Sequence, residues 1–69
     1  MELNPAANDH IEHFPELRAN VLQASGMVSV QARCTVDDAI SMMRDRALIE
    51  HTDIVEIADA VVERRIRFG

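Results

Sequence analysis

The sequence is poor in the residues that build covalent cross-links and aromatic surfaces. Its 69 residues include one cysteine, Cys34, two phenylalanines, and no tyrosine or tryptophan. A single cysteine excludes an internal disulfide and the paired-cysteine zinc modules, and it is typical of a reducing compartment. The chain also lacks the aromatic platform on which sheet-type RNA-binding proteins stack bases. We therefore expect an aliphatic core, in which Cys34 is a structural residue.

The sequence also lacks membrane-spanning segments and catalytic motifs. No apolar run is long enough to span a bilayer, and the N-terminus has no basic stretch followed by an apolar one. We expect a soluble, cytoplasmic protein without membrane contact. There is no glycine-rich phosphate loop, zinc spacing or strand-turn-helix context for a nucleophile, so we expect no enzyme and no cofactor. His10 and His13, three residues apart, could hold a metal from one helical turn, but nothing supplies the remaining ligands and we expect no metal site.

Lysine is missing too, and the charge is unevenly balanced. All seven basic residues are arginines, twelve residues are acidic, and the net charge is −5. Arginine suits bidentate contacts with phosphate or guanine, but it suits carboxylate pairs equally well. Because a domain that neutralises phosphates usually has a basic surface, the composition by itself argues against nucleic acid.

The length of the chain and the spacing of its apolar residues predict an all-α fold. A chain of this length forms at most one domain, and it buries barely enough apolar surface to fold alone, so self-association or a protein partner is expected. We divide it into residues 1–14, a tail or short helix beginning at Asn4-Pro5, and residues 15–69, a compact three-helix bundle. Pro15 opens the first helix of the bundle. Its apolar stripe is Leu17, Val21, Ala24 and Val28.

Capping residues mark the other two helices. Thr35 with Asp38 has the form of a capping box, and Asp53 with Glu56, also three residues apart, is a similar helix start. The apolar set of the second helix is Ala39, Ile40, Met43 and Ala47, and that of the third is Ile54, Ile57, Ala58, Val61 and Val62. Arg64, Arg65 and Arg67 follow the third helix, where they either complement the helix dipole or contact phosphate. Ile66 and Phe68 either pack back onto the bundle or enter a partner.

Small residues in the helices indicate close packing. Ala24, Gly26, Ala39, Ala47 and Ala58 predict helices that approach nearly backbone to backbone. Gly26 is interpreted as a close crossing, with the alternative that the helix ends or kinks there. A second apolar face of the same helix, made of Leu22, Met27, Val28 and Val30, is the expected dimer surface.

Several of these residues together resemble the ANTAR family of bacterial antitermination regulators. The similarity covers Arg18 to Val62 without a gap, and its matching residues are Arg18, Val21, Gln23, Ala24, Gly26, Asp38, Ala39, Met43, Arg44, Ala47, Glu56, Ile57 and Ala58. The resemblance implies a three-helix module that binds paired stem-loops in nascent mRNA and favours the antiterminated form, so that polymerase reads through a terminator.

The resemblance also implies the RNA-binding residues. Arg18 and Arg44 would contact phosphates or loops, and Gln23 would read a base edge. Arg33 is a further candidate RNA-binding residue, expected to share an exposed patch with Arg18 and Arg44. Ser25 stands where the family usually has a lysine, within the same implied surface. Because that lysine is missing and the net charge is negative, the alternative is an ANTAR-like fold that has lost RNA binding and serves as a protein-interaction or dimerisation module.

Overall fold

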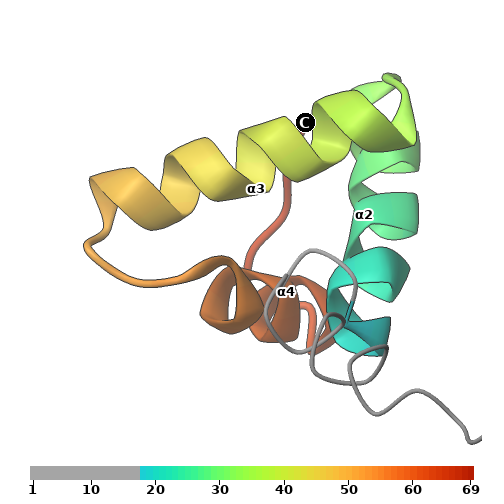
Figure 1. The fold of residues 1–69 in the computed structure, drawn as a ribbon. Helices are drawn as coiled ribbons and strands as arrows, with labels where there is room; N and C mark the ends of the chain where they lie inside the picture. The colour runs from blue at the N-terminus through green and yellow to red at the C-terminus, as the bar shows by residue number, and fades with distance from the viewer. Residues whose placement is uncertain (1–17) are drawn as a thin grey trace, which may run out of the picture.

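A computed structural model describes residues 18–69, which form three helices and no strand in this range. They are α2 (Ala19–Ala32), α3 (Val36–Ile49) and α4 (Ile54–Val62). Short turns join them, and every helix packs against the other two (Figure 1). The expected all-α three-helix bundle is confirmed. The predicted start of the first helix at Pro15 is wrong, because α2 begins at Ala19 and Arg18 before it has an extended backbone. The predictions for residues 1–14, for His10 and His13 and for Leu17 concern residues outside the described range.

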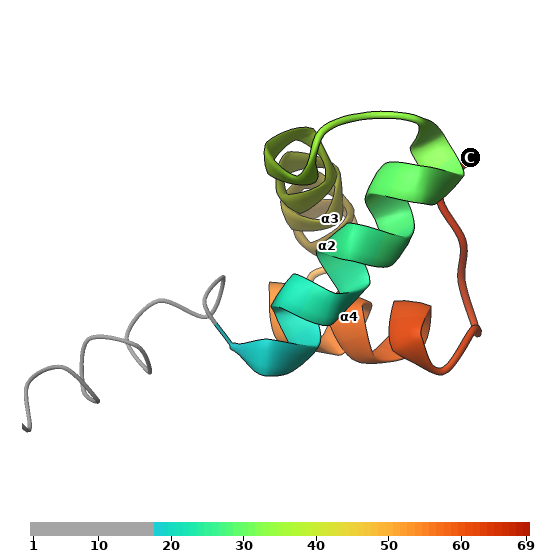
Figure 2. The same cartoon turned by 90° about the vertical axis from the view of Figure 1, so that its right-hand side faces the viewer.

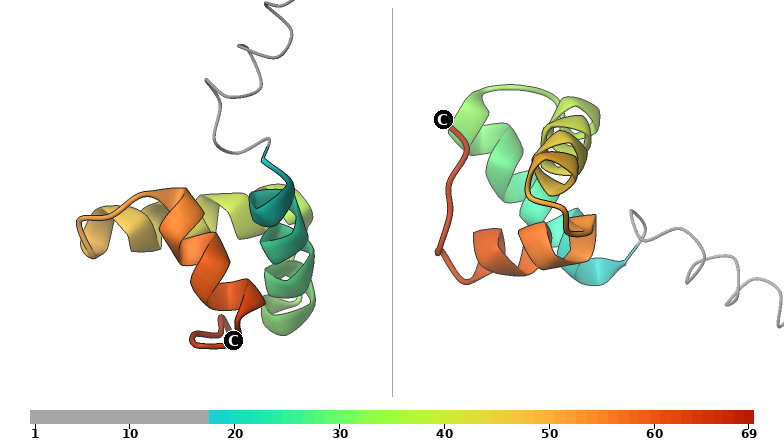
Figure 3. Two further views of the ribbon diagram at one scale, coloured as in Figure 1. Left: turned by 90° about the horizontal axis from the view of Figure 1, so that it is seen from below. Right: turned by 90° about the vertical axis from the view of Figure 1, so that its left-hand side faces the viewer.

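The helices cross rather than run side by side. Figure 2 shows α2 in front of α3 and above α4, and Figure 3 shows α4 running obliquely beneath α3. The C-terminal end of α4 lies beside the N-terminal turns of α2 (Figure 1), where Asn20 contacts Asp59. Each helix therefore buries one side against the other two and leaves its opposite side to solvent. None of the helices in residues 18–69 is long and apolar enough to cross a membrane.

Local capping sets where α3 and α4 begin. The Thr35 hydroxyl accepts a hydrogen bond from the Asp38 amide at 3.0 Å, and an Asp53 carboxylate oxygen accepts one from the Glu56 amide at 2.9 Å. Both bonds satisfy an amide that has no partner within the helix. The two predicted helix starts are therefore confirmed.

Each of the three helices in the described range is followed, one or two residues after its last residue, by a residue in the left-handed conformation. Arg33, His51 and Arg64 have φ values of 55°, 57° and 63°. In each case the next amide reaches back to a carbonyl of the last turn, as in a Schellman motif. These bonds run from Cys34 N to Ser29 O (2.9 Å), from Thr52 N to Ala47 O (2.9 Å) and from Arg65 N to Ala60 O (2.8 Å). Glycine usually occupies this position, so each side chain carries a conformational cost.

Small side chains fill much of the core. Ala24, Ala39 and Ala58 are fully buried and Ala47 nearly so, which confirms their predicted packing role. Met43 is the largest of the fully buried side chains. The remaining buried hydrophobic residues are Val21, Val28, Ile54, Ile57, Ala60 and Val61. Cys34 is partly buried against this core, consistent with a structural role.

Gly26 does not follow the same rule. A Cβ built there would meet nothing within 4 Å, so the predicted close crossing is wrong. The helix does not end there either, because α2 continues through Gly26 to Ala32. The reason is geometric: Gly26 is two residues from both Ala24 and Val28, which places it on the opposite side of a helix that turns about 100° per residue.

The chain after α4 returns to the other helices. Ile66 and Phe68 pack against the core, and the Phe68 amide donates a hydrogen bond to Gln31 Oε1 at 2.9 Å. The Arg46 guanidinium lies 5.8 Å from the centroid of the Phe68 ring. Of the two sequence-based alternatives for Ile66 and Phe68, the structure shows packing back onto the bundle.

Candidate functional site

The exposed side of α2 is the surface on which most of the predicted site residues lie. Arg18 precedes the helix, Gln23 lies in its second turn, and Arg33 follows its last residue; all three are exposed. Arg18 makes no side-chain capping bond to the helix. Because α2 has 14 residues, its ends are about 21 Å apart along the axis at 1.5 Å per residue. Arg18 and Arg33 therefore occupy the two ends of one face rather than a single cluster.

Ser25 does not belong to this surface. Its residue exposure is 1%, and its hydroxyl donates a hydrogen bond to the Leu22 carbonyl at 2.7 Å. The side chain lies on the same side of α2 as the buried Val21 and Val28. Its inclusion among the RNA-contacting residues is therefore corrected: a side chain enclosed by the bundle has no access to RNA.

Arg44 lies on a different helix with a different electrostatic character. It is exposed on α3, whose solvent side also presents Asp37, Asp38 and Asp45. Arg44 thus lies on a different helix from the one that Arg18 and Arg33 flank, and its own helix also carries three exposed carboxylates. The predicted RNA-binding residues do not form one patch free of acidic neighbours.

Charge is segregated between α2 and the rest of the described chain. No residue within α2 is charged. All the acidic residues of the described range come later in the sequence, at Asp37, Asp38, Asp45, Glu50, Asp53, Glu56, Asp59 and Glu63. A 2.7 Å hydrogen bond from Asn20 Nδ2 to Asp59 Oδ1 brings one of these carboxylates next to the first turn of α2. The α2 face therefore presents arginines at both ends and no carboxylate of its own, a feature visible in the sequence as an acid-free run from Arg18 to Val36.

Apolar side chains occupy the middle of the same face. Leu22 and Val30 are 47% and 78% exposed. Together with the open position at Gly26 they form a stripe in which residues follow each other at intervals of four. Met27 and Val28, predicted to be part of this surface, are instead buried: Met27 is partly buried against the core and Val28 is fully buried. The predicted apolar face thus exists for Leu22 and Val30 only.

The arginines after α4 form no second patch free of acids. Arg64, Arg65 and Arg67 are exposed and lie beyond the last helical residue, Val62. Arg65 Nε donates to a Glu63 carboxylate oxygen at 2.8 Å, in an ion pair exposed to solvent. Such pairs contribute little to stability, but this one leaves Arg65 partly neutralised.

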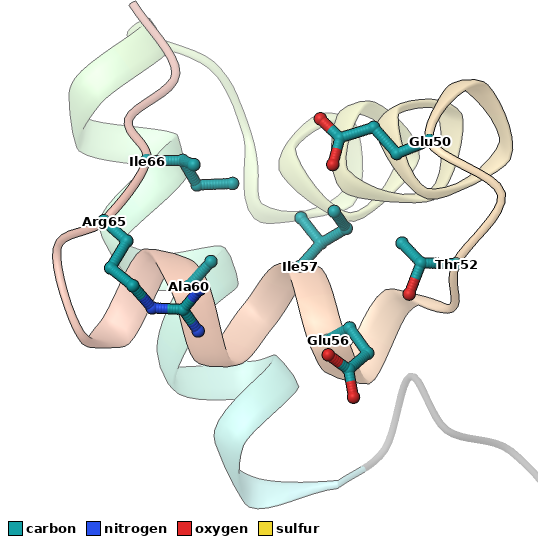
Figure 4. A pocket seen from close by; sticks show the side chains of 7 residues that line it. All are labelled: Glu50, Thr52, Glu56, Ile57, Ala60, Arg65 and Ile66. Atoms are coloured by element: carbon teal, nitrogen blue, oxygen red, sulfur yellow. The ribbon is translucent and has the colours of Figure 1, made fainter.

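A shallow pocket of about 200 Å³ lies between the end of α3 and α4 (Figure 4). Its lining residues are Glu50, Thr52, Glu56, Ile57, Ala60, Arg65 and Ile66. Two of its charged groups already have partners, since Glu50 pairs with Arg46 and Arg65 pairs with Glu63. Within residues 18–69 there is also no group of three or more side chains that could hold a metal ion. The pocket therefore offers few unpaired polar groups to orient a ligand.

The fold and the exposed side of α2 define a small all-α domain in which one helix has no acidic residue. No family model, curated protein or solved structure significantly matches the chain. The ANTAR resemblance therefore remains a prediction from the residues quoted above.

Proposed function

We propose that this chain is an RNA-binding transcription antitermination regulator, which acts in the cytoplasm on stem-loops of nascent mRNA and has a binding rather than a catalytic role. The observation that carries the proposal is the charge segregation: the exposed face of α2 has Arg18 and Arg33 at its ends and no acidic residue between them. A polyanion can approach this face without meeting a carboxylate of α2, whereas the solvent side of α3 would repel it.

The distribution of the family-like residues supports the same proposal. The matching alanines, Ala24, Ala39, Ala47 and Ala58, are all buried, and packing explains them. The other matching residues proposed for a site, Arg18, Gln23 and Arg44, are exposed. Packing of the core does not require an arginine or a glutamine at an exposed position. A binding role therefore explains Arg18, Gln23 and Arg44 better than packing does.

In the proposed mechanism, phosphate contacts position the protein on the RNA, and the protein binds one of two competing RNA folds more tightly than the other. Arg18 and Arg33 contact backbone phosphates, and Gln23, between them, hydrogen-bonds the edge of an unstacked loop base. A protein that binds the antiterminated RNA fold more tightly than its competitor shifts the population toward it by that difference in affinity. Because the whole chain has a net charge of −5, long-range attraction is weak and the affinity depends on these close contacts.

A gel-shift titration against an RNA of two adjacent hairpins tests the proposal. We expect binding at low salt that weakens as salt rises, and we expect Arg18→Ala and Arg33→Ala each to reduce the slope of log K against log salt by about 0.7 to 0.9. Arg44→Ala should have a smaller effect, because carboxylates on α3 keep RNA away from it. Arg67→Ala, an exposed change outside the face, is the matched control. Absence of a shift at low salt with several hairpin RNAs would refute the proposal.

The second candidate function is a dimerisation or protein-interaction module that no longer binds RNA. Leu22 and Val30 favour it, because two large aliphatic side chains stand exposed on the same helix face. Light scattering separates the candidates: this function requires an oligomer or a stable partner complex without RNA. Val30→Asp should abolish it without unfolding the domain, because Val30 is 78% exposed. A wild-type monomer that binds hairpin RNA would exclude this candidate.

A further inference from the structure

Asp59 differs from the other carboxylates of the described range. It is partly buried, whereas every other acidic residue within 18–69 is exposed. Its Oδ1 accepts the 2.7 Å hydrogen bond from Asn20 Nδ2, which joins α4 to the first turn of α2. A carboxylate withdrawn from water is usually paired with a cation, because its charge is costly to desolvate. Asp59 forms no ion pair with residues 18–69, and its partner is a neutral amide.

The second oxygen of Asp59 is available to a further donor. Asn20 occupies Oδ1, and Oδ2 makes no hydrogen bond within the described part of the chain. Each buried side-chain nitrogen or oxygen in that part has a partner, so Oδ2, which has none, reaches solvent. An ionised carboxylate accepts hydrogen bonds and cannot donate them. The bundle therefore presents one acceptor whose orientation is held by the bond that Asn20 makes to the neighbouring oxygen.

This acceptor lies at the Arg18 end of α2. α4 passes beside the N-terminal turns of α2 (Figure 1), and Asn20 is the second residue of that helix. Arg18 comes two residues before Asn20, and the exposed Gln23 comes three residues after it. Side chains three residues apart on a helix are neighbours, so Gln23 adjoins the Asn20–Asp59 pair. One end of the surface thus combines an arginine with two groups that can contact the edge of a base.

A carboxylate at this place distinguishes the two parts of a nucleotide. It repels phosphate, as do Glu56 and Glu63, which lie three residues before and four residues after Asp59 on α4. It attracts the exocyclic amino group of an unpaired base, which is present in adenine, cytosine and guanine. Uracil has no such group, and its single N–H lies between two carbonyl oxygens that a carboxylate repels. The Asp59 position therefore favours a base over the backbone, and an amino-bearing base over uracil.

We propose that Asp59, positioned by Asn20, accepts a hydrogen bond from the exocyclic amino group of an unpaired loop base and discriminates against uridine, while Arg18 contacts a neighbouring phosphate. The inference rests on the proposed RNA-binding function and deepens it, because it assigns base selection to a residue outside α2. Asn20 acts through Asp59, so it is a positioning residue.

Two RNAs that differ only in the amino donor test this contact. Both contain two adjacent hairpins, and loop cytidines in the first are replaced by uridines in the second. The replacement exchanges the N4 amino donor for the O4 acceptor and leaves the backbone unchanged. In gel-shift titrations, the full chain should bind the cytidine RNA about tenfold more tightly, as expected for one hydrogen bond to a charged acceptor.

Asp59→Asn separates the contact with the base from the contact between the helices. Its amide oxygen still accepts from Asn20, but its amide nitrogen now donates where Oδ2 accepted. The preference for cytidine should therefore be lost and the O4 acceptor of uridine favoured. Asp45→Asn, which removes the same charge from an exposed position of α3, is the matched control. It should change the affinity for both RNAs by one factor and keep the wild-type ratio. Circular dichroism checks that both variants fold.

Asn20→Ala tests the positioning role. Without the bond to Oδ1 the carboxylate rotates freely, so the cytidine-to-uridine affinity ratio should fall toward one although Asp59 keeps its charge. A purely structural role of the Asn20–Asp59 bond would lower stability in urea unfolding and leave this ratio unchanged.

The outcomes separate this inference from the proposed function. Equal affinity of the wild type for the two RNAs, or an Asp59→Asn variant that keeps the cytidine preference, overturns the inference and leaves RNA binding intact. Absence of binding to either RNA overturns the proposed function, and nucleotides then test the base contact alone. The side-chain amide signals of Asn20 in a ¹⁵N-correlated NMR spectrum should shift with cytidine monophosphate and not with uridine monophosphate. Equal shifts with both nucleotides, or no shift with either, overturn the base contact.

Discussion

Replacing Gly26 by alanine should make the domain more stable, contrary to what its place in the sequence suggests. Glycine between Ala24 and Val28 resembles a site of close helix packing, at which an added methyl group would clash. In the structure the new methyl group would have no neighbour within 4 Å. The only large effect left is therefore the change in helix propensity.

The magnitude follows from that single effect. Alanine is favoured over glycine in a helix interior by about 1 kcal/mol, largely because the unfolded glycine has more backbone freedom to lose. No steric cost offsets the gain at this position, so we expect Gly26→Ala to raise the free energy of unfolding by about 0.5 to 1 kcal/mol. In a domain of this size 1 kcal/mol corresponds to a rise of about 4 to 8 °C in Tm.

Thermal and urea unfolding followed by circular dichroism measure this change. Both should be run at two protein concentrations, because self-association would add a concentration-dependent term. Ala58→Val provides a contrast, since Ala58 is fully buried and an enlarged side chain in a packed core costs about 1 to 3 kcal/mol. The two small residues should therefore respond with opposite signs.

The result that refutes this reasoning is a loss of stability in Gly26→Ala comparable to that in Ala58→Val. Such a loss at low protein concentration would mean that another helix of the same chain packs against Gly26. The exposed side of α2 would then be buried, and neither RNA nor a protein partner could reach it.

Three further changes test other parts of the fold by urea unfolding. Thr35→Ala should cost about 1 kcal/mol, because the Asp38 amide loses its capping acceptor, and Thr35→Ser should retain most of the stability. His51→Gly should stabilise the domain by about 1 kcal/mol, because His51, just after the C-cap of α3, has a φ of 57° that glycine adopts without strain; a loss of stability would contradict this. Met43→Ala should lower the free energy of unfolding by about 2 to 5 kcal/mol, because removing the fully buried Met43 side chain leaves a cavity. A smaller loss would show that the core collapses around the gap.

The three helices and the starts of α3 and α4 could be predicted because their causes are local, whereas α2 begins at Ala19 and not at the predicted Pro15. The Thr35 and Asp53 caps act on amides three residues away, and the alanine positions follow the period of one helix. The contact between Phe68 and Gln31 could not be predicted in this way, because its partners are 37 residues apart and no short-range pattern links them. The sequence accordingly left open whether Phe68 packs within the chain or in a partner.

The candidate site was predicted less well than the fold, and the reason is which side of α2 each residue occupies. Ser25 is adjacent in sequence to the buried Ala24 and is buried with it, whereas Gln23 on the other side of Ala24 is exposed. Met27 reaches the core although it was assigned to the free face. A shift of one residue turns a side chain by about 100° around the helix axis, so small errors in assigning a face exchange buried and exposed residues.

By itself, the amino-acid sequence determined that this chain forms helices with defined starts, an aliphatic core rich in alanine, and a stretch around α2 without acidic residues. Periodicity, capping and composition act within a few residues and need no knowledge of the rest of the chain. Only the tertiary structure decided that Ser25 is enclosed, that Gly26 stands open, and that Arg44 lies apart from Arg18 and Arg33. Those outcomes depend on α3 and α4 covering one side of α2 and leaving the other to solvent, which is a property of the packed bundle.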